Sequence, residues 1–248
     1  MLLEGEGCAV AVDLLEVADR IGEVGVRLSS SEPMEAGASE GALLGREQRG
    51  RQGANTMKRE AIAVNEFVVP AVSVWGERWF LLAAGDFKAG AFNMMTVAWG
   101  GFGVMWSKPL AMVVVRPSRY TYQFMEKGAS FSLCAFPPAC KGKLEFCGSK
   151  SGREVDKLKG CGLTPIGLET IAEPGFDEAE LIVECRKMYY DDFKPEHFLA
   201  PDIENNYSGS DYHRMYFGEI LAVHATREYR VKALSPDLGA PGSRFHFS

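Results

Sequence analysis

The most constraining feature of this 248-residue sequence is the placement of its aromatic residues. None of the 15 Phe, 8 Tyr and 4 Trp residues lies before residue 57. Residues 1–56 are instead rich in Gly, Ala, Ser and Glu, with one short apolar run, VDLLEVADRI. A segment of this composition buries too little apolar surface to offset the conformational entropy that folding removes. We therefore expect residues 1–56 to be a disordered N-terminal extension and the folded protein to start near Met57.

The remaining sequence is dominated by strand-like segments. Apolar runs such as PLAMVVV are typical of buried strands, and the strand-like segments are 61–84, 92–103, 109–117, 129–136, 179–190 and 213–226. Short helical patterns lie between them: one follows Ser118 as N-cap, one spans 139–148, and one starts from a capping box of Ser151 and Glu154. This pattern favours a mainly β protein with a few short helices over residues 57–234, folded as a closed or split β-barrel rather than a parallel α/β sheet. Residues 235–248 are predicted to be a C-terminal tail.

Charge and cysteine content argue against several classes of protein. Residues 57–248 hold 23 acidic and 22 basic side chains, so they lack the basic footprint of a nucleic-acid-binding protein. No apolar run reaches the ~20 residues of a membrane-spanning helix. The six Cys residues form no C-x-x-C pair and have no His at zinc-ligand spacing. We therefore expect no metal site and reduced thiols in a cytoplasmic protein, with Cys147 as the best candidate for a reactive thiol.

The stretch VVVRPSRYTYQF, residues 113–124, places charge and hydroxyl groups directly after a strand of the buried type. Arg116 and Arg119 flank Ser118, which is predicted to cap a helix whose free N–H groups and dipole favour an anion. Arg suits bidentate phosphate contacts, and Ser118 and Thr121 can donate hydroxyl hydrogen bonds. The pattern fits a phosphate cradle, and it fits equally well a surface turn in which Ser118 only caps and the arginines are solvated.

Two further clusters fit other parts of a ligand. FNMMTVAWG places Asn93 and Thr96 among Met and Trp residues, a polarizable surface suited to a planar heteroaromatic ring, although such residues are also ordinary core material. The loop CGSKSGREVDK offers Lys150 and two serine hydroxyls to a polar ligand arm, or it simply opens a helix. The sequence has no dinucleotide-binding glycine motif and no paired-carboxylate pattern, and its four His residues are scattered.

Four segments, taken in order, resemble the flavoredoxin-type members of the flavin reductase-like, FMN-binding split-barrel family: FNMMTVAWGGFGVMWSKPLAMVVVRPSRYTYQFMEKGASFSL, FCGSKSGREVDKLKGCGLTP, ECRKMYY and DYHRMYFGEI. The resemblance covers about residues 60–230. It implies a six-stranded antiparallel split barrel that forms a homodimer and holds FMN non-covalently near the subunit interface. The paired prolines in CAFPPACKGKLEF depart from the acidic, helical stretch that the family leads us to expect there.

The resemblance also implies roles for individual residues. The segment 93–96 would lie along the isoalloxazine ring, RPSRYT would hold the phosphate and part of the ribityl chain, and GSKSG would close over the ligand. Tyr189, Tyr190 and His213 would approach the ring or a second substrate. The cofactor-binding residues implied in this way are Asn93, Met94, Met95, Thr96, Arg116, Ser118, Arg119, Tyr120, Thr121, Ser149, Lys150 and Ser151. No side chain is expected to act as a dedicated acid or base, because a flavin carries the chemistry itself.

Three functions are compatible with this resemblance. The first is an FMN-dependent oxidoreductase of the NAD(P)H:flavin reductase type, with NADH or NADPH as the electron donor. The second is a flavoredoxin-like electron carrier that exchanges electrons with a protein partner, and the third is an FMN-binding protein without turnover. All three stay open here, because a nicotinamide site in such a barrel has no compact motif. For the phosphate cradle, the sequence predicts that Arg116→Ala weakens FMN binding by about 1.5–3 kcal/mol.

Overall fold

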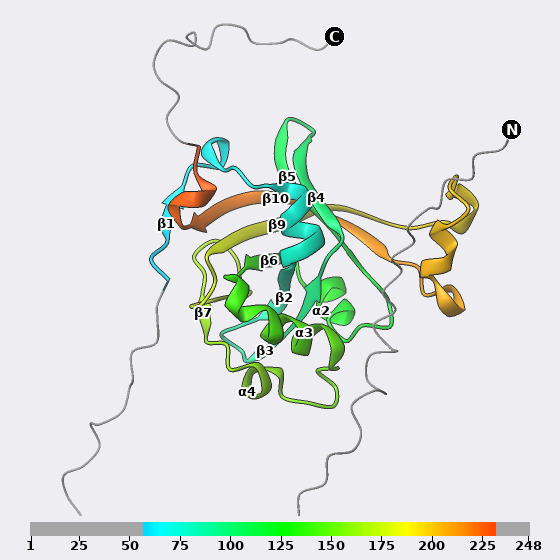
Figure 1. The fold of residues 1–248 in the computed structure, drawn as a ribbon, viewed down its shortest axis with the longest axis horizontal. Helices are drawn as coiled ribbons and strands as arrows, with labels where there is room; N and C mark the ends of the chain where they lie inside the picture. The colour runs from blue at the N-terminus through cyan, green and yellow to red at the C-terminus, as the bar shows by residue number, and fades with distance from the viewer. Residues whose placement is uncertain (1–56, 232–248) are drawn as a thin grey trace, which may run out of the picture. The chain divides into compact units, whose positions relative to one another are not determined.

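The computed structural model describes residues 57–231, so the predictions for residues 1–56 and for the tail 235–248 lie outside the described range. Residues 57–231 form ten strands and four α-helices (Figure 1). The strands are β1 (Glu60–Ile62), β2 (Phe80–Asp86), β3 (Ala91–Val97), β4 (Gly100–Met105), β5 (Lys108–Val115), β6 (Ser130–Ala135), β7 (Pro165–Gly167), β8 (Pro174–Phe176), β9 (Leu181–Asp192) and β10 (Arg214–Ala225). The helices are α1 (Ala71–Ser73), α2 (Tyr122–Lys127), α3 (Lys141–Ser149) and α4 (Lys157–Cys161). Within the described range no helix has the length and apolar character needed to cross a membrane.

One antiparallel sheet of eight strands forms the body of the fold. Its order is β3-β2-β6-β9-β10-β5-β4, with β1 added beside β10, and β7 and β8 form a separate ribbon. The two ends of this order, β3 and β4, are separated in the chain by only Ala98 and Trp99. The sheet therefore curls until its ends approach each other, which makes a split barrel. This confirms the predicted mainly β, split antiparallel barrel, with two more strands than the resemblance implied.

The long hairpin of β9 and β10 bends around the barrel. Its register shifts between Phe217 and Gly218 and again between Ile220 and Ala222, and such bulges increase the twist and bend of a strand. Gly218 is required at the first shift, because a Cβ atom there would lie 2.6 Å from Cζ of the Phe131 ring. Residues 193–213 leave the barrel between these two strands and return to it at β10 (Figure 1).

The strand β2 is buried on both faces. Phe80, Leu82 and Ala84 belong to the core inside the barrel. Leu81 and Ala83 belong to a second core that also contains residues of α3 and α4. Burial on both faces explains why this strand is a continuous apolar run rather than an alternating one, and it fixes α3 and α4 against the outside of the barrel.

One segment predicted as strand is helical. Residues 71–78 form α1 followed by a π-helical turn, Val74–Arg78. Val74 and Trp75 are buried in the barrel core, where the rings of Trp75 and Phe80 lie 4.6 Å apart. The packing of Val74 and Trp75 in the core outweighs the β-propensity of the local sequence, because β-propensity depends strongly on context.

Two helices begin later than predicted. α2 starts four residues after Ser118, because the residues before it form turns closed by the bonds from Arg119 N to Arg116 O and from Tyr122 N to Arg119 O, both 3.0 Å. Ser118 therefore does not cap α2. The predicted capping box at Ser151 is also wrong, since α4 starts after Asp156 and its carboxylate accepts from Lys159 N at 3.2 Å.

The helix predicted over residues 139–148 is confirmed as α3. The paired prolines, Pro137 and Pro138, precede it without breaking it, because Pro138–Cys140 forms one turn of 3-10 helix that leads directly into α3. Pro is tolerated at such an N-terminal position, where its missing N–H has no partner to lose.

Candidate functional site

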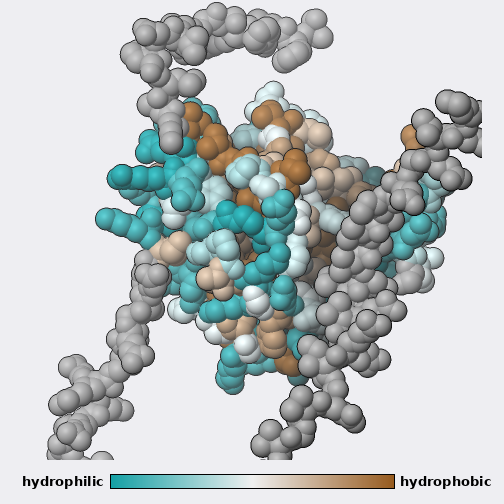
Figure 2. Space-filling model, in the orientation of Figure 1, coloured by the Kyte–Doolittle hydropathy of each residue, from teal (hydrophilic) through white to brown (hydrophobic). Residues whose placement is uncertain are grey.

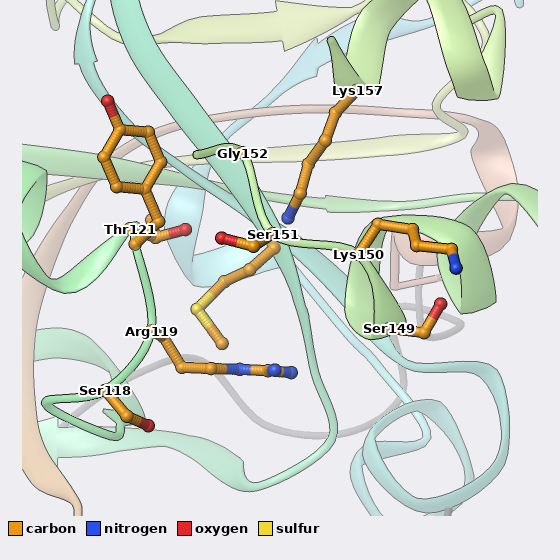
Figure 3. A pocket seen from close by; sticks show the side chains of 10 residues that line it. Ser118, Arg119, Thr121, Ser149, Lys150, Ser151, Gly152 and Lys157 are labelled. Carbon is orange, nitrogen blue, oxygen red and sulfur yellow. The ribbon is translucent and has the colours of Figure 1, made fainter. Parts of the chain in front are cut away.

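The turn after β5, the loop after α3 and the start of α4 surround one cavity (Figure 3). It encloses about 140 Å³ and is lined by Met95, Ser118, Arg119, Tyr120, Thr121, Ser149, Lys150, Ser151, Gly152 and Lys157. Eight of the binding residues predicted from the sequence line this cavity, and they come from three separate parts of the chain. The other four, Asn93, Met94, Thr96 and Arg116, do not line it.

The predicted ring-binding segment presents its side chains to both faces of β3. Met95 reaches the cavity, and Asn93 on the same face donates from Nδ2 to Thr121 Oγ1 at 2.8 Å. Met94 is buried in the second core, and Thr96 donates to a main-chain carbonyl of α3 at 2.5 Å. Because successive side chains of a strand point to opposite faces, only Met95 of this segment contributes a cavity-lining side chain.

The backbone of β3 offers a second kind of contact. β3 is an end strand of the sheet and pairs with β2 alone. Lys157 Nζ donates to the Met94 carbonyl at 2.8 Å, so this carbonyl points away from β2. In an antiparallel pair the N–H and C=O of one residue point to the same side, and every second residue repeats the pattern. The N–H groups of Met94 and Thr96 therefore lie on the free edge.

The two arginines of the turn have different surroundings. Arg119 Nη2 donates to Gly148 O at 2.6 Å, and the side chain reaches across the cavity (Figure 3). Burial, followed by the nearby charge of Arg116, lowers the pKa of Arg119. Arg116 instead donates to Asn206 O at 2.7 Å and lies 5.0 Å from the centroid of the Tyr207 ring. Of these two cations, only Arg119 belongs to the cavity.

The main-chain and side-chain donors of Ser118 are both bound to a carboxylate. The Ser118 N–H donates to Asp211 Oδ1 at 3.1 Å, and its hydroxyl donates to Asp211 Oδ2. The predicted anion seat at a helix N-terminus is therefore corrected. α2 has six residues and begins at Tyr122, so the positive groups at the cavity are side chains rather than the end of a long helix.

Gly152 allows the loop after α3 to close against the turn and β3. A Cβ atom at this position would lie 2.3 Å from Asn93 Oδ1 and 2.9 Å from Cδ1 of the Tyr120 ring. The loop also keeps its shape through Ser151, whose Oγ accepts from the main-chain N–H two residues later at 3.2 Å. Only a residue without a side chain permits this close approach.

Two of the ten cavity-lining residues, Gly152 and Lys157, were not among the predicted binding residues, and Lys157 is the charged one. It is 7% exposed, and its Nζ donates to the carbonyls of Met94 at 2.8 Å and Cys147 at 2.7 Å. Burial is the main cause that lowers the pKa of Lys157 to about 8. Lys150 is exposed, and its side chain runs outward from the rim (Figure 3). No sequence signal separates Lys157 from the exposed lysines, because its burial depends on how α4 packs beside α3 and β3.

The thiol chemistry predicted for Cys147 is also corrected. Cys147 is fully buried. The neighbouring Cys161 thiol, followed by burial, raises the pKa of Cys147, so this group stays protonated. Because the thiolate is the reactive form, Cys147 is not a reactive thiol.

The three residues expected to approach the ring lie outside the cavity. Tyr189 and Tyr190 are exposed on β9. His213 Nδ1 lies 3.0 Å from Tyr207 Oη, and the ring lies 5.0 Å from that of Trp99. Burial, followed by the positive charge of a nearby arginine, lowers the pKa of His213 to about 4. His213 is therefore neutral at pH 7 and forms part of an aromatic cluster beside the turn.

Comparison with known proteins shows the family to which the chain belongs. A comparison with curated proteins found no match. The FMN-binding domain of a flavin reductases-like enzyme from Shewanella baltica OS155 is 18% identical, with a TM-score of 0.51 over 69% of this chain and 79% of that one. The flavoredoxins of Desulfovibrio vulgaris (Miyazaki F) and Methanosarcina acetivorans are 20% and 24% identical, each with a TM-score of 0.48, over 73% and 66% of this chain and 78% and 76% of theirs. Residues 79–234, more than half of the chain, match the flavin reductase like domain. The chain therefore belongs to the flavin reductase-like domain family.

Proposed function

We propose that the cavity binds FMN non-covalently and that the protein is an FMN-dependent oxidoreductase. Membership of the flavin reductase-like family supports this proposal, as does the description of the Shewanella protein as an FMN-binding domain. FMN has three chemically different parts: a phosphate, a polyol arm and a planar ring. The residues around the cavity can be compared with the contacts that each part requires.

The observation that carries the proposal is a pair of cations that are bonded to carbonyls rather than carboxylates. Arg119 and Lys157 approach the same central space from opposite sides (Figure 3), and their hydrogen bonds go to the main-chain oxygens of residues 94, 147 and 148. The charge of Asp211 acts on the half-buried Arg119, whereas no carboxylate of the described residues forms an ion pair with Lys157, and burying such a charge without a counter-ion is costly. A bound dianion removes this cost, and the phosphate of FMN is such a group.

The other parts of FMN also have suitable contacts. The hydroxyls of Thr121 and Ser151 line the cavity and suit the polyol arm. At about 140 Å³ the cavity is smaller than the ~300–1,000 Å³ of pockets that enclose drug-sized ligands. We therefore place the ring system at the mouth, against Met95 and the free N–H groups of β3. When bound, FMN supplies hydride and single-electron transfer, while these residues bind it, orient it and exclude water.

The first experiment asks whether the protein retains flavin. Purified protein is incubated with excess FMN, passed through a desalting column and scanned from 300 to 550 nm. We expect a flavin spectrum at about one FMN per chain. A colourless protein after desalting contradicts the proposal.

The second experiment identifies the electron donor, which we propose to be NADH or NADPH. The flavin-loaded protein is mixed with each nicotinamide nucleotide in a stopped-flow instrument, and bleaching of the flavin is followed. Bleaching within seconds supports an NAD(P)H-dependent reductase. Slow bleaching by both nucleotides, together with fast reduction by a ferredoxin-like protein, favours a flavoredoxin-like electron carrier instead.

A further inference from the structure

We propose that the ammonium group of Lys157 is the buried counter-charge for the phosphate of the ligand, so that loss of its proton releases the ligand. This inference rests on the proposed function and goes beyond it, because it assigns to one residue the control of affinity by pH. Three features of the described residues support it: the geometry of the ammonium group, the charges around it and the ease with which it loses a proton.

The geometry leaves one donor of Lys157 for a ligand. An ammonium group has three N–H donors, and two of them are used by the carbonyls of Met94 and Cys147. The nitrogen lies in the cavity wall, and its side chain points toward the centre beside Ser151 (Figure 3). Lys157 is 7% exposed, so its charged end is held at the cavity and away from bulk water. The third N–H is therefore available to an anion in the cavity.

The charges around Lys157 do not neutralise it. The charged or titratable groups that act on it are Cys147 on α3, Cys161 on its own helix and Arg119 on the turn. β3 contributes only the carbonyl of Met94. Arg119 is a second cation and makes the ammonium form less favourable, while the thiols become negative only when they ionise. Among the described residues no carboxylate forms an ion pair with Lys157, and a phosphate dianion would provide the missing negative charge.

The direction of the pH effect follows from this arrangement. Burial lowers the pKa of Lys157 to about 8 in the free protein, and a bound dianion raises it again, because opposite charge favours the protonated form. The phosphate loses its second proton near pH 6 and does not titrate at higher pH. Affinity for FMN is therefore constant from about pH 7 to pH 8 and falls above pH 8. Riboflavin has the same ring and arm but no phosphate, so its affinity should not follow this profile.

The test measures dissociation constants for FMN and for riboflavin by quenching of flavin fluorescence between pH 7 and pH 9.5. The variants are Lys157→Met and Lys159→Met, a matched control in which an exposed lysine of the same helix is changed. Cys161→Ser controls for ionisation of the neighbouring thiol. For the wild type, Lys159→Met and Cys161→Ser, we expect Kd for FMN to rise above pH 8 by up to tenfold per pH unit. For Lys157→Met we expect Kd at pH 7 to be at least tenfold higher and independent of pH.

Each outcome decides a separate point. FMN binding by the wild type that does not change between pH 7 and pH 9.5 overturns the role of Lys157 and leaves the proposed function intact. The same conclusion follows if Lys157→Met binds FMN as tightly as the wild type, or if riboflavin shows the same loss above pH 8. Failure of the wild type to bind FMN at any pH overturns the proposed function together with this inference. The wild-type profile is decisive even if Lys157→Met does not fold.

Discussion

Arg116 and Arg119 stand three positions apart, yet only Arg119 reaches the cavity. The turn after β5 directs Arg119 inward toward α3 and Arg116 outward toward the ring of Tyr207. Sequence spacing shows that both cations are near the turn, but the direction of each depends on turn geometry and on the distant segment 193–213. The effect that the sequence predicted for Arg116→Ala is therefore expected at Arg119.

Substitution of the two arginines tests this assignment. Arg119→Ala should weaken FMN binding by about 1.5–3 kcal/mol, the loss expected for a charge-assisted hydrogen bond. Arg116→Ala should cause a much smaller loss, because its guanidinium is bonded outside the cavity. Titration calorimetry with FMN gives both values. A greater loss for Arg116→Ala than for Arg119→Ala would reverse the assignment.

His213 should make the protein less stable in mild acid. The pKa of His213 is about 4 in the folded protein, against 6.5 for an unperturbed histidine. Below pH 6.5 the unfolded chain therefore binds a proton that the folded protein does not bind. The free energy of unfolding should fall as pH drops from 6.5 to 4. Urea unfolding at pH 7.5, 5.5 and 4.5 measures this slope.

His213→Asn is the matched variant, because its amide cannot take up the proton. The difference in unfolding free energy between wild type and variant should shrink, or change sign in favour of the variant, as pH falls from 6.5 to 4. A difference that stays constant over this range means that His213 does not contribute to the pH dependence.

At the scale of secondary structure elements, the cavity depends on the loop after α3 lying against β3. Gly152→Ala should destabilise the fold by about 1–3 kcal/mol, because the added methyl group overlaps Asn93 Oδ1. It should also weaken FMN binding, since the loop must move away from the turn. Thermal unfolding with and without FMN measures both effects.

Gly142→Ala is the control for this substitution. Gly142 lies in α3, and a Cβ atom there meets nothing within 4 Å. Ala is favoured over Gly in a helix by about 1 kcal/mol, so this variant should be at least as stable as the wild type with unchanged FMN affinity. Equal destabilisation by both variants would show that the packing of Gly152 against β3 is not the cause.

The elements differ in how well their sequences define them. The core strands of the barrel were predicted because runs such as Leu81–Ala84 and Val113–Val115 are apolar whichever face they bury. The starts of α2 and α4 were not predicted correctly. Each start depends on which residue forms the capping hydrogen bonds, and in both cases the sequence offers several candidates that look equally suitable. Ser118 resembles an N-cap, but its donors go to Asp211, 93 residues further along the chain.

Some residues of the candidate site were predicted from the sequence and others were not. The clusters around Arg119 and Ser151 were recognised because their residue types suit a phosphate and a polyol arm. Lys157 was missed, because a lysine on a short polar helix gives no sign of burial. Met94 was expected at the ring, and its side chain is instead in the second core, because strand alternation sends every second side chain of β3 to the opposite face.

At the scale of the whole molecule, the hairpin of β4 and β5 carries hydrophobic side chains that nothing in residues 57–231 covers. Val104 is 74% exposed and Trp106 is 57% exposed. Hydrophobic residues gather where this hairpin projects (Figure 2). The Trp106 ring lies 6.0 Å from that of Tyr189, which extends the exposed aromatic surface onto β9. We propose that a second copy of the chain covers this surface, as the predicted homodimer requires.

A charge in this surface should separate the two copies. Trp106→Glu is expected to shift the protein from dimer to monomer in sedimentation velocity experiments at micromolar concentration. Lys88→Glu, an exposed change of charge on the turn between β2 and β3, should leave the dimer intact. A wild type that sediments as a monomer contradicts the proposed dimer, and a dimeric Trp106→Glu variant contradicts this location for the interface.

The most direct test of the proposed site is an experimental structure of the protein crystallised with saturating FMN. We predict that the phosphate lies between the turn 116–121 and the loop 149–152, with its oxygens about 3 Å from Arg119 and from Nζ of Lys157. Flavin density with the phosphate at any other place, or no flavin density in this cavity, would contradict the assignment.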